Sequence, residues 1–347
     1  MEATPQQLKA LPPPLLAWYD ENRRVLPWRE QVSPYRTWVS EIMLQQTRVT
    51  AVLPYFDRFM AALPTVAALA DAPEQQLMSL WQGLGYYSRT RNLQKAAQVI
   101  MTRHGGVFPD TYEGLTALPG VGDYTAGAIA SIAFGQPVPA VDGNVLRLAA
   151  RLTGCDDNVL EPKTRARFRR WMAEVIPPDR PGAFNQALMD LGAMVCLPNG
   201  APLCEQCPAR TFCTACEKGL QRQLPVREKK TARRVEQRTV FLLRQEDAIA
   251  LRQRPATGLL AGLWEFPNVP GALTERQAAE QLAKWGLIPH QWGKSFTDKH
   301  VFTHITWEMT VFTITVQGAG PPEWVWCPDS ERENYPMPTA FGKLEKE

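Results

Sequence analysis

Two short segments constrain the fold and function of this chain more than any others. Residues 118–129 read LPGVGDYTAGAI, where Gly120 and Gly122 precede a helical pattern. Glycines let the main chain turn tightly and approach a ligand, and the next helix N-terminus offers unpaired N–H groups that suit a phosphate. Residues 141–147, VDGNVLR, then place the carboxylate of Asp142 before another helix. Together the segments predict a main-chain turn that can bind a phosphate, followed closely in the sequence by a carboxylate.

The rest of the chain predicts a helical domain followed by a smaller mixed domain. Residues 14–215 carry apolar residues at helical spacing, with Gly and Pro at the segment ends and almost no strand signal. Later segments rich in Val, Ile, Thr, Phe and Trp predict strands, interrupted by one helix, TERQAAEQLAKWG. The expected fold class is therefore multidomain α and α+β. We expect an all-α domain at 1–220, a basic linker at 221–236 and an α+β domain at 237–347.

Composition and charge indicate a globular protein with one basic segment. Apolar residues make up 45% of the sequence, and no run of 18 of them predicts a membrane helix. The N-terminal segment has an acidic second residue and prolines where a signal peptide needs an apolar run, so we expect a cytoplasmic protein. The net charge is only +3, but residues 217–238 hold eight Lys/Arg against three Asp/Glu. This segment is either a solvated linker or a contact to phosphate.

The two opening segments resemble those of the helix–hairpin–helix DNA glycosylases of the endonuclease III superfamily. The resemblance implies a six-helix part at about 30–140 and a cluster-bearing part at 1–29 plus 141–220. In the lyase members, the residue two after the second hairpin glycine is a lysine, whose amine forms a Schiff base with the sugar. That position is Tyr124 here, and a phenol forms no imine. The resemblance thus implies a monofunctional glycosylase, although Tyr124 taken alone would be a packing residue.

Asp142 has two interpretations. An Asp directly before a helix usually caps it. In the superfamily, an aspartate at this place stabilises positive charge as the N-glycosidic bond breaks, and the resemblance gives Asp142 that role. Asn144 would then lie close by and support the site through hydrogen bonds.

Glu41 lies within VSEIMLQQT, between apolar residues of a predicted helix. Such an acid is either exposed on one face or buried for a reason. The string closely resembles a segment of the adenine DNA glycosylases of the MutY type, in which this glutamate is the general acid. Protonation of adenine N7, the family mechanism, gives a neutral leaving group while the sugar gains oxocarbenium character. The role requires burial to raise the pKa of Glu41 while Asp142 stays ionised.

The same resemblance implies further contacts to DNA and to the extruded base. Gln45 is four residues after Glu41, on the same predicted helical face, and matches a glutamine that enters the duplex near the oxidised guanine. Tyr86, in GLGYYSRTRNL, matches the residue that wedges between bases, with core packing as the alternative. The positions that match the adenine pocket are Trp28, Arg29 and Gln186.

Five of the seven cysteines fall within residues 196–216. In a chain without an export signal, such clustering predicts metal rather than disulfides. The superfamily pattern for a [4Fe–4S] cluster is C-x6-C-x2-C-x5-C, which this chain follows with one extra residue in the first interval. The implied ligands are Cys196, Cys204, Cys207 and Cys213. A zinc site that uses Cys216 is the alternative. The loop LPNGAPL lacks the basic residues that relatives use for phosphate, and Arg210 could replace them only in part.

Residues 237–347 resemble the Nudix-like domain of MutY-type proteins. The glutamate-rich signature of Nudix hydrolases is missing, so nucleotide pyrophosphatase activity is not expected. Phe302, Thr303 and His304 resemble the family's Phe-Ser-His loop, which recognises 8-oxoguanine opposite the adenine. Threonine keeps the hydroxyl of that serine and adds a methyl group. On composition alone, the segment would be a strand end with a packed phenylalanine.

The leading hypothesis is a monofunctional glycosylase that excises adenine mispaired with 8-oxoguanine or guanine in double-stranded DNA. A thymine or uracil mismatch glycosylase is disfavoured by Glu41 and by the segment 302–304. A catalytically silent DNA-binding protein is disfavoured because Glu41 and Asp142 are both present, and a Nudix hydrolase by its missing signature. No oligomerisation signal is visible, and we expect a monomer.

Overall fold

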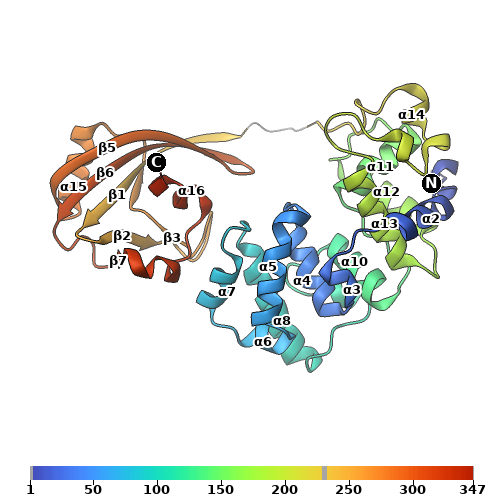
Figure 1. Ribbon diagram of the computed structural model, residues 1–347, viewed down its shortest axis with the longest axis horizontal. Coiled ribbons are helices and arrows are strands. Elements are labelled where there is room, and N and C mark those ends of the chain that lie inside the picture. The colour runs from blue at the N-terminus through green and yellow to red at the C-terminus, as the bar shows by residue number, and fades with distance from the viewer. Residues whose placement is uncertain (1–2, 229–232, 347) are drawn as a thin grey trace. The chain divides into compact units, whose positions relative to one another are not determined.

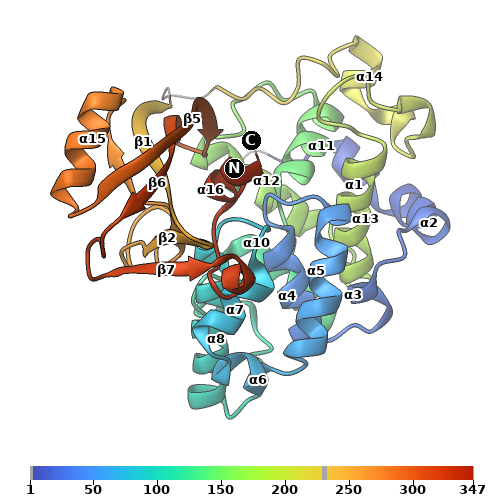
Figure 2. The ribbon, with the colours of Figure 1, turned by 60° about the vertical axis from the view of Figure 1, so that its left-hand side comes forward.

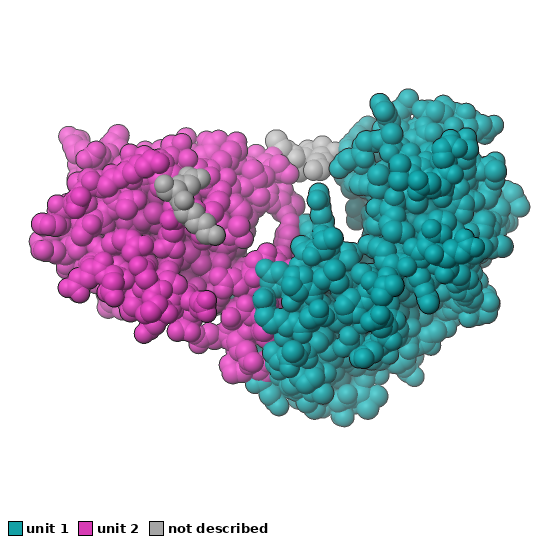
Figure 3. Space-filling model, in the orientation of Figure 1, with its two compact units in different colours: residues 1–71, 91–229 teal, residues 72–90, 230–347 magenta. Residues whose placement is uncertain are grey.

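The computed structural model describes residues 3–228 and 233–346 (Figure 1). The chain divides into two compact units, residues 1–71 with 91–229 and residues 72–90 with 230–347 (Figure 3). The first is the helical unit and the second is the sheet unit. Part of the predicted linker, residues 229–232, lies outside the described residues. The rest differs from a free linker, because residues up to 228 belong to the helical unit and a strand begins at Arg234.

The helical unit is built from short helices separated by tight turns. They are α1 (Gln6–Lys9), α2 (Pro12–Asn22), α3 (Pro27–Glu30), α4 (Pro34–Leu44), α5 (Val49–Ala62), α6 (Val66–Asp71), most of α8 (Ser88–His104), α9 (Tyr112–Thr116), α10 (Asp123–Phe134), α11 (Gly143–Thr153), α12 (Pro162–Val175), α13 (Pro181–Met194), α14 (Thr214–Lys218) and the single 3₁₀ turns η1 (Cys204–Gln206) and η2 (Arg210–Phe212). The prediction of an all-α domain is confirmed.

Two helices that bear site residues have well-defined ends. Asp142 caps α11, accepting hydrogen bonds from the main-chain N–H groups of Asn144 and Val145. Gly154 ends the same helix in a left-handed conformation (φ 71°), which only glycine adopts freely. α10 starts after Gly122 and ends in the same way at Gly135 (φ 66°). The Asp142 cap therefore sets where α11 begins, and left-handed glycines set where α10 and α11 end.

Close helix packing brings the site-bearing helices together. α10 packs against both α4 and α13, and α13 packs against α11 and α2. The packing leaves no room for side chains at two places: a Cβ atom on Gly127 would lie 2.4 Å from the carbonyl oxygen of Pro139, and one on Gly182 would lie 2.8 Å from that of Ser131. One large core joins the first two helices to α11, α12 and α13, with Leu15 among its fully buried members.

The sheet unit contains one seven-stranded mixed sheet. Its strands are β1 (Arg234–Gln245), β2 (Ala248–Gln253), β3 (Trp264–Glu265), β4 (Asn268–Pro270), β5 (Ile288–Val301), β6 (Ile305–Gln317) and β7 (Trp324–Pro328). The main order is β3-β2-β1-β6-β5, with β4 paired to β1 and β7 to β2. β1 and β6 are parallel, whereas β5 and β6 form a long antiparallel hairpin.

Helices cover both faces of this sheet. Leu282, on α15 (Glu275–Lys284), belongs to a core with Phe241 and Ile314. Phe341, on α16 (Thr339–Gly342), belongs to a second core with neighbouring, oppositely facing strand residues such as Val240. α15 lies beside β1 and β6 in two views (Figures 1 and 2). The unit also includes α7 (Glu74–Trp81), η3 (Asp329–Asn334) and η4 (Leu344–Lys346). The predicted Nudix-like α+β domain is thus confirmed.

Candidate active site in the helical unit

A cavity of about 470 Å³ opens in the helical unit where α3, α4, α10, α11 and α13 meet. Seven residues proposed from the sequence line it: Trp28, Arg29, Glu41, Tyr124, Asp142, Asn144 and Gln186. They come from segments as far apart as residues 28 and 186, so the fold gathers them. Neither hairpin glycine lines the cavity, because the turn precedes α10 whereas Tyr124 lies within its first turn.

Glu41 is buried in this cavity. Only 4% of its surface is exposed, and its Oε2 accepts a 2.7 Å hydrogen bond from the Tyr124 hydroxyl. Burial raises the pKa of Glu41 to about 7, with a further upward contribution from the charge of Asp142. The Tyr124 hydrogen bond and the charge of Arg29 oppose this rise. Glu41 can therefore carry a proton near neutral pH, as a general acid must.

Asp142 caps α11 and also lines the cavity. Its Oδ1 accepts 2.9 Å bonds from the N–H groups of Asn144 and Val145, and its Oδ2 accepts a 2.8 Å bond from Asn144 Nδ2. Burial raises the pKa of Asp142, and these bonds together with the Arg147 charge lower it. Burial therefore acts on both carboxyls, whereas the sequence analysis invoked it only for Glu41. The donors around Asp142 all favour its ionised form.

Tyr124 is a hydrogen-bond partner of Glu41 rather than a packing residue alone. Burial and the nearby carboxylates raise its pKa well above the usual value, so the phenol stays protonated. Its hydroxyl donates to Glu41, and no amine occupies this position. The geometry is compatible with base excision and offers no Schiff-base nucleophile at residue 124.

Asp190 is a site residue that the sequence analysis missed. It is completely buried in α13, where Arg29 donates to both of its oxygens (2.7 and 3.0 Å) and Arg24 Nε donates at 2.8 Å. Asp190 is visible in the string FNQALMDLGAMVC. The sequence alone does not show whether an Asp in such a string is buried or exposed, because that depends on its partners. The available signal was the closeness in sequence of Arg24, which had no assigned role, to the pocket candidate Arg29.

The prediction for Gln45 is wrong in its geometry. α4 ends at Leu44, and Gln45 has non-helical dihedral angles, so it does not share a helical face with Glu41. The next residue, Gln46, has a left-handed conformation (φ 58°) that turns the chain out of the helix. Gln45 Nε2 instead donates a 3.4 Å bond to Thr125 Oγ1, at the start of α10. The glutamine thus lies beside the hairpin helix.

Of the two hairpin glycines, Gly120 alone has a left-handed backbone, since Gly122 has a φ of −93° that any residue adopts. Gly120 has a φ of 73°, and a Cβ atom there would lie 2.6 Å from the Asn92 side chain. At Gly122 the equivalent position is open space. Asp123, the first residue of α10, is bound by Tyr112 and Arg169. The N-terminus of α10 is therefore accessible at Gly122, although Asp123 brings a negative charge beside it.

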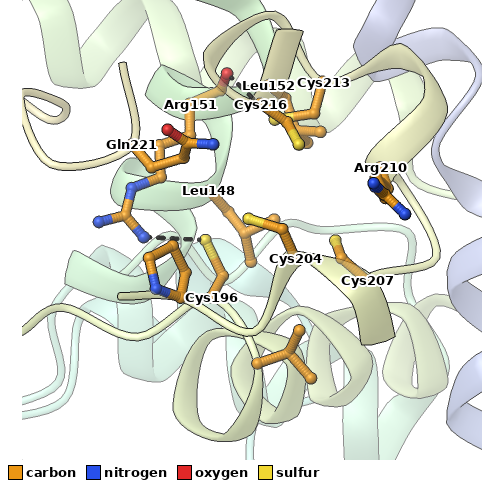
Figure 4. A pocket seen from close by; sticks show the side chains of 12 residues that line it. Leu148, Arg151, Leu152, Cys196, Cys204, Cys207, Arg210, Cys213, Cys216 and Gln221 are labelled. Atoms are coloured by element: carbon orange, nitrogen blue, oxygen red, sulfur yellow. Dashed lines mark hydrogen bonds between the residues drawn. The ribbon is translucent and has the colours of Figure 1, made fainter. Parts of the chain in front are cut away.

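Five cysteine side chains line a second, smaller cavity (Figure 4). They are Cys196, Cys204, Cys207, Cys213 and Cys216. Arg151 closes one side by donating a 3.2 Å bond to the Cys196 sulfur and a 2.9 Å bond to the Leu197 carbonyl. Burial raises the pKa of Cys207 to about 12. Within residues 3–228 and 233–346, no three Cys, His, Asp or Glu groups are grouped closely enough to hold a metal ion.

Arg210 is not free to replace the missing basic residues of the loop. It forms an ion pair with Glu205 at the protein surface. Its charge is therefore partly neutralised before any phosphate arrives.

In the sheet unit, the predicted lesion-reading residues form the turn between β5 and β6. Phe302 packs on Trp307 with ring centroids 4.8 Å apart, whereas Thr303 and His304 are exposed. The Tyr86 hydroxyl lies 2.9 Å from the Thr303 hydroxyl, and Tyr86 has a left-handed backbone (φ 48°) that is uncommon outside glycine. Tyr86 is 46% exposed, so core packing does not explain it. The predicted wedge and the predicted reader are thus direct neighbours.

Two protein-family profiles match the two parts of the chain. A profile of the HhH-GPD superfamily base excision DNA repair proteins matches residues 39–174, and a NUDIX domain profile matches residues 239–347. The adenine DNA glycosylase of Homo sapiens is 36% identical, over 95% of this chain and 72% of that protein. This chain belongs to the adenine DNA glycosylase family. The Rattus norvegicus adenine DNA glycosylase is 35% identical, over 95% of the chain and 76% of the relative.

Solved glycosylase structures share the fold of the helical unit. A thermostable thymine-DNA glycosylase superposes with a TM-score of 0.55 at 26% identity, covering 62% of this adenine DNA glycosylase and all of that chain. Endonuclease III in a trapped covalent complex with DNA superposes with a TM-score of 0.53 at 25% identity, covering 63% and 100%. With its adenine DNA glycosylase relatives and this fold, the present chain is an adenine-specific DNA N-glycosylase of base excision repair. Among its described helices, none combines the length and apolarity that a membrane span requires.

Proposed function

We propose that the enzyme excises adenine mispaired with 8-oxoguanine or guanine in double-stranded DNA, by hydrolysis of the N-glycosidic bond and without cutting the strand. One observation carries the proposal. A protonatable, buried Glu41 and a hydrogen-bonded Asp142 face the same cavity, and Tyr124 stands where a lyase would need an amine. The family likeness supports the adenine specificity. We expect the enzyme to act as a monomer.

The two carboxyls support a stepwise reaction. Glu41 would donate its proton to a ring nitrogen of the extruded adenine, which then leaves as a neutral base. Asp142, held by Asn144 and by the N-terminus of α11, would stabilise the positive charge that develops on the sugar. Trp28, Arg29 and Gln186 would enclose the base, since extruded bases are bound by stacking and by polar contacts to their edges. Water would complete the hydrolysis.

The binding contacts follow from the same proposal. Gly120 and Gly122 would let the hairpin approach a phosphate through neutral N–H donors. Tyr86 would enter the base stack, and Gln45 would enter the duplex from the turn after α4. In the sheet unit, Phe302 would support the turn while Thr303 and His304 meet the base opposite the adenine.

The test uses duplexes that carry A, T or U opposite G or 8-oxoguanine. The intact protein should release free adenine, fastest opposite 8-oxoguanine, and leave the abasic strand uncut until it is treated with alkali. Borohydride should trap no covalent adduct. Release of thymine or uracil instead of adenine, or a trapped adduct, would overturn the assignment.

Replacing Thr303 should weaken recognition of the oxidised base selectively. 8-Oxoguanine presents an N7–H donor where guanine has an acceptor, and a Thr303 hydroxyl can accept from it. Thr303→Val keeps the shape and removes the hydroxyl, so we expect the preference for 8-oxoguanine:A over G:A to fall by about tenfold, the value of one hydrogen bond. Single-turnover rates on both duplexes measure this ratio. Thr303→Ser is the matched control and should keep it; an unchanged ratio in Thr303→Val would contradict the role.

We further propose that the cysteine-lined cavity holds a [4Fe–4S] cluster. A donor set made only of thiols suits iron–sulfur chemistry, and the spacing supports Cys196, Cys204, Cys207 and Cys213 as ligands. When bound, such a cluster would draw together thiols that line one cavity but are not grouped closely enough for a metal ion among the described residues, and it would thereby order the loop between α13 and α14. Cys216 lines the same cavity, so zinc held by Cys204, Cys207, Cys213 and Cys216 is the competing outcome.

Single cysteine substitutions should identify the ligand set. We expect Cys207→Ser to lose most of its iron and its brown colour, because a ligand common to both sets is removed. Cys196→Ser should lose iron only if the four-iron set is correct, and Cys216→Ser should then keep it. Metal analysis of the purified proteins gives the result, with Cys155→Ser as a control outside the cavity. Stoichiometric zinc in a colourless protein would reject the cluster.

A further inference from the structure

We propose that Asp190 is a positioning residue that holds the Arg29 guanidinium away from Glu41, so that Glu41 keeps the proton it delivers to the base. This inference rests on the proposed function, because it assumes that Glu41 is the general acid. Asp190 reaches the reacting centre only through Arg29. Nothing in the family likeness assigns it a role.

The contacts of Asp190 are those of a built clamp. Its side chain has no exposed surface, and both of its oxygens are occupied by Arg29 in a two-pronged contact (2.7 and 3.0 Å). Arg24 adds its Nε at 2.8 Å and its main-chain N–H at 3.2 Å. Two arginines thus compensate one buried carboxylate, which accounts for the lowered pKa of Asp190. A buried charge with this many donors is fixed in place.

Arg29 connects this clamp to the cavity. It lines the cavity with Glu41, and its charge interacts with that of Glu41. Its guanidinium also lies 5.9 Å from the Tyr19 ring centroid, and the Tyr19 hydroxyl donates to Gln186 at 3.2 Å. The hydrogen bond that Glu41 accepts comes from Tyr124 instead. Both terminal nitrogens of Arg29 therefore donate to Asp190, whereas Glu41 accepts its hydrogen bond from the Tyr124 phenol.

Loss of the Asp190 charge would change the electrostatic environment of Glu41. The groups that face Glu41 are Tyr124 from α10, Asp142 from the start of α11 and Arg29 from α3. Without Asp190, Arg29 has one full uncompensated charge and a free two-pronged donor beside a carboxyl of the same cavity. A carboxylate is the partner that such a guanidinium favours. Glu41 would then ionise at lower pH and cease to be a proton donor at neutral pH.

The experiment is the pH dependence of single-turnover adenine release by the full-length enzyme and Asp190→Asn. Activity should fall as pH rises and Glu41 loses its proton. We expect this alkaline limb to move to lower pH in Asp190→Asn, giving a loss of tenfold or more at pH 8 that is largely recovered at pH 5.5. Asp190→Asn/Arg29→Gln removes both charges and should move the limb back towards the wild-type position. Asp20→Asn, which breaks the exposed Asp20–Arg180 pair, should leave the profile unchanged.

Each outcome decides the matter. A rate loss in Asp190→Asn that is equal at every pH would show a structural role only and overturn the inference. Thermal unfolding monitors whether Asp190→Asn folds; if it does not, Arg29→Gln replaces it, and its alkaline limb should move to higher pH because the charge that lowers the Glu41 pKa is removed. No adenine release by the wild-type enzyme would be the failure of the proposed function, and it is scored before any variant is compared.

Discussion

Glu41→Gln is expected to lower the rate of adenine release from an 8-oxoguanine:A duplex by about 10²- to 10⁴-fold, the usual contribution of a general acid. Glutamine has the same shape and can still accept the 2.7 Å bond from Tyr124, but it has no proton to give to the ring nitrogen. The residual rate should lose the pH dependence that the Glu41 pKa of about 7 imposes. Single-turnover rates between pH 5 and 9 measure both effects.

Duplex binding by Glu41→Gln is the control, since the cavity keeps its shape and affinity for substrate should be retained.

The pH dependence of folding stability gives a second test of the raised Glu41 pKa. A carboxyl with a folded pKa near 7 binds its proton more tightly in the folded than in the unfolded state. The contribution of Glu41 to the stability of the wild type should therefore be largest below the unfolded pKa of 4.5 and be lost as pH rises through 7. Relative to wild type, Glu41→Gln should gain up to about 3 kcal/mol between pH 4.5 and 8. Full activity in this variant would refute the assignment.

Asp142→Asn is expected to reduce adenine release by about 10³-fold while the protein stays folded. Asparagine is as good a helix cap as aspartate, so α11 should keep its start. The negative charge that would stabilise the sugar cation is lost. In addition, the amide nitrogen that replaces Oδ2 would face Asn144 Nδ2, which donates to Oδ2 at 2.8 Å in the wild type. Two donors would then face each other. Single-turnover rates and thermal unfolding, compared with wild type, separate the chemical loss from any structural one.

The matching control for Asp142→Asn is binding of a duplex in which the adenine nucleotide resists cleavage. Removing a negative charge near a phosphate backbone should leave the affinity unchanged or increase it. Weakened binding in parallel with the lost rate would mean that Asp142 acts in positioning DNA rather than in the reaction.

Most of the architecture follows from sequence because it depends on local signals. Glycines at Gly135 and Gly154, a capping Asp142 and apolar residues at helical spacing are visible without a structure. The same holds for the strands: β1 is buried continuously over residues 239–243 and β6 is buried along most of its length, as their Val- and Phe-rich composition predicts. Glu41 and Tyr124 could be proposed through family likeness, and the structure adds that they are hydrogen-bonded across 83 positions of sequence.

The site features that the sequence did not predict depend on contacts between distant segments or on where a helix ends. Asp190 acquires its role only because α13 places it against Arg24 and Arg29, some 160 residues earlier. The raised pKa of Asp142 comes from burial by surrounding helices, which a capping motif does not reveal. Gln45 was misplaced because helical periodicity continues past Leu44, whereas the left-handed Gln46 ends the helix.

The core that joins the first two helices to α11, α12 and α13 has a consequence for how the chain is made. Leu8, Leu11 and Leu15 are completely buried against residues such as Trp171 and Leu188. On the ribosome, the N-terminal segment emerges long before these partners, so its apolar side chains must wait until α13 has been synthesised. Closure of this long loop makes the step intrinsically slow. Nascent chains that stop short of α13 should therefore be recognised by chaperones and proteases, whereas chains released just beyond it should become protease-resistant.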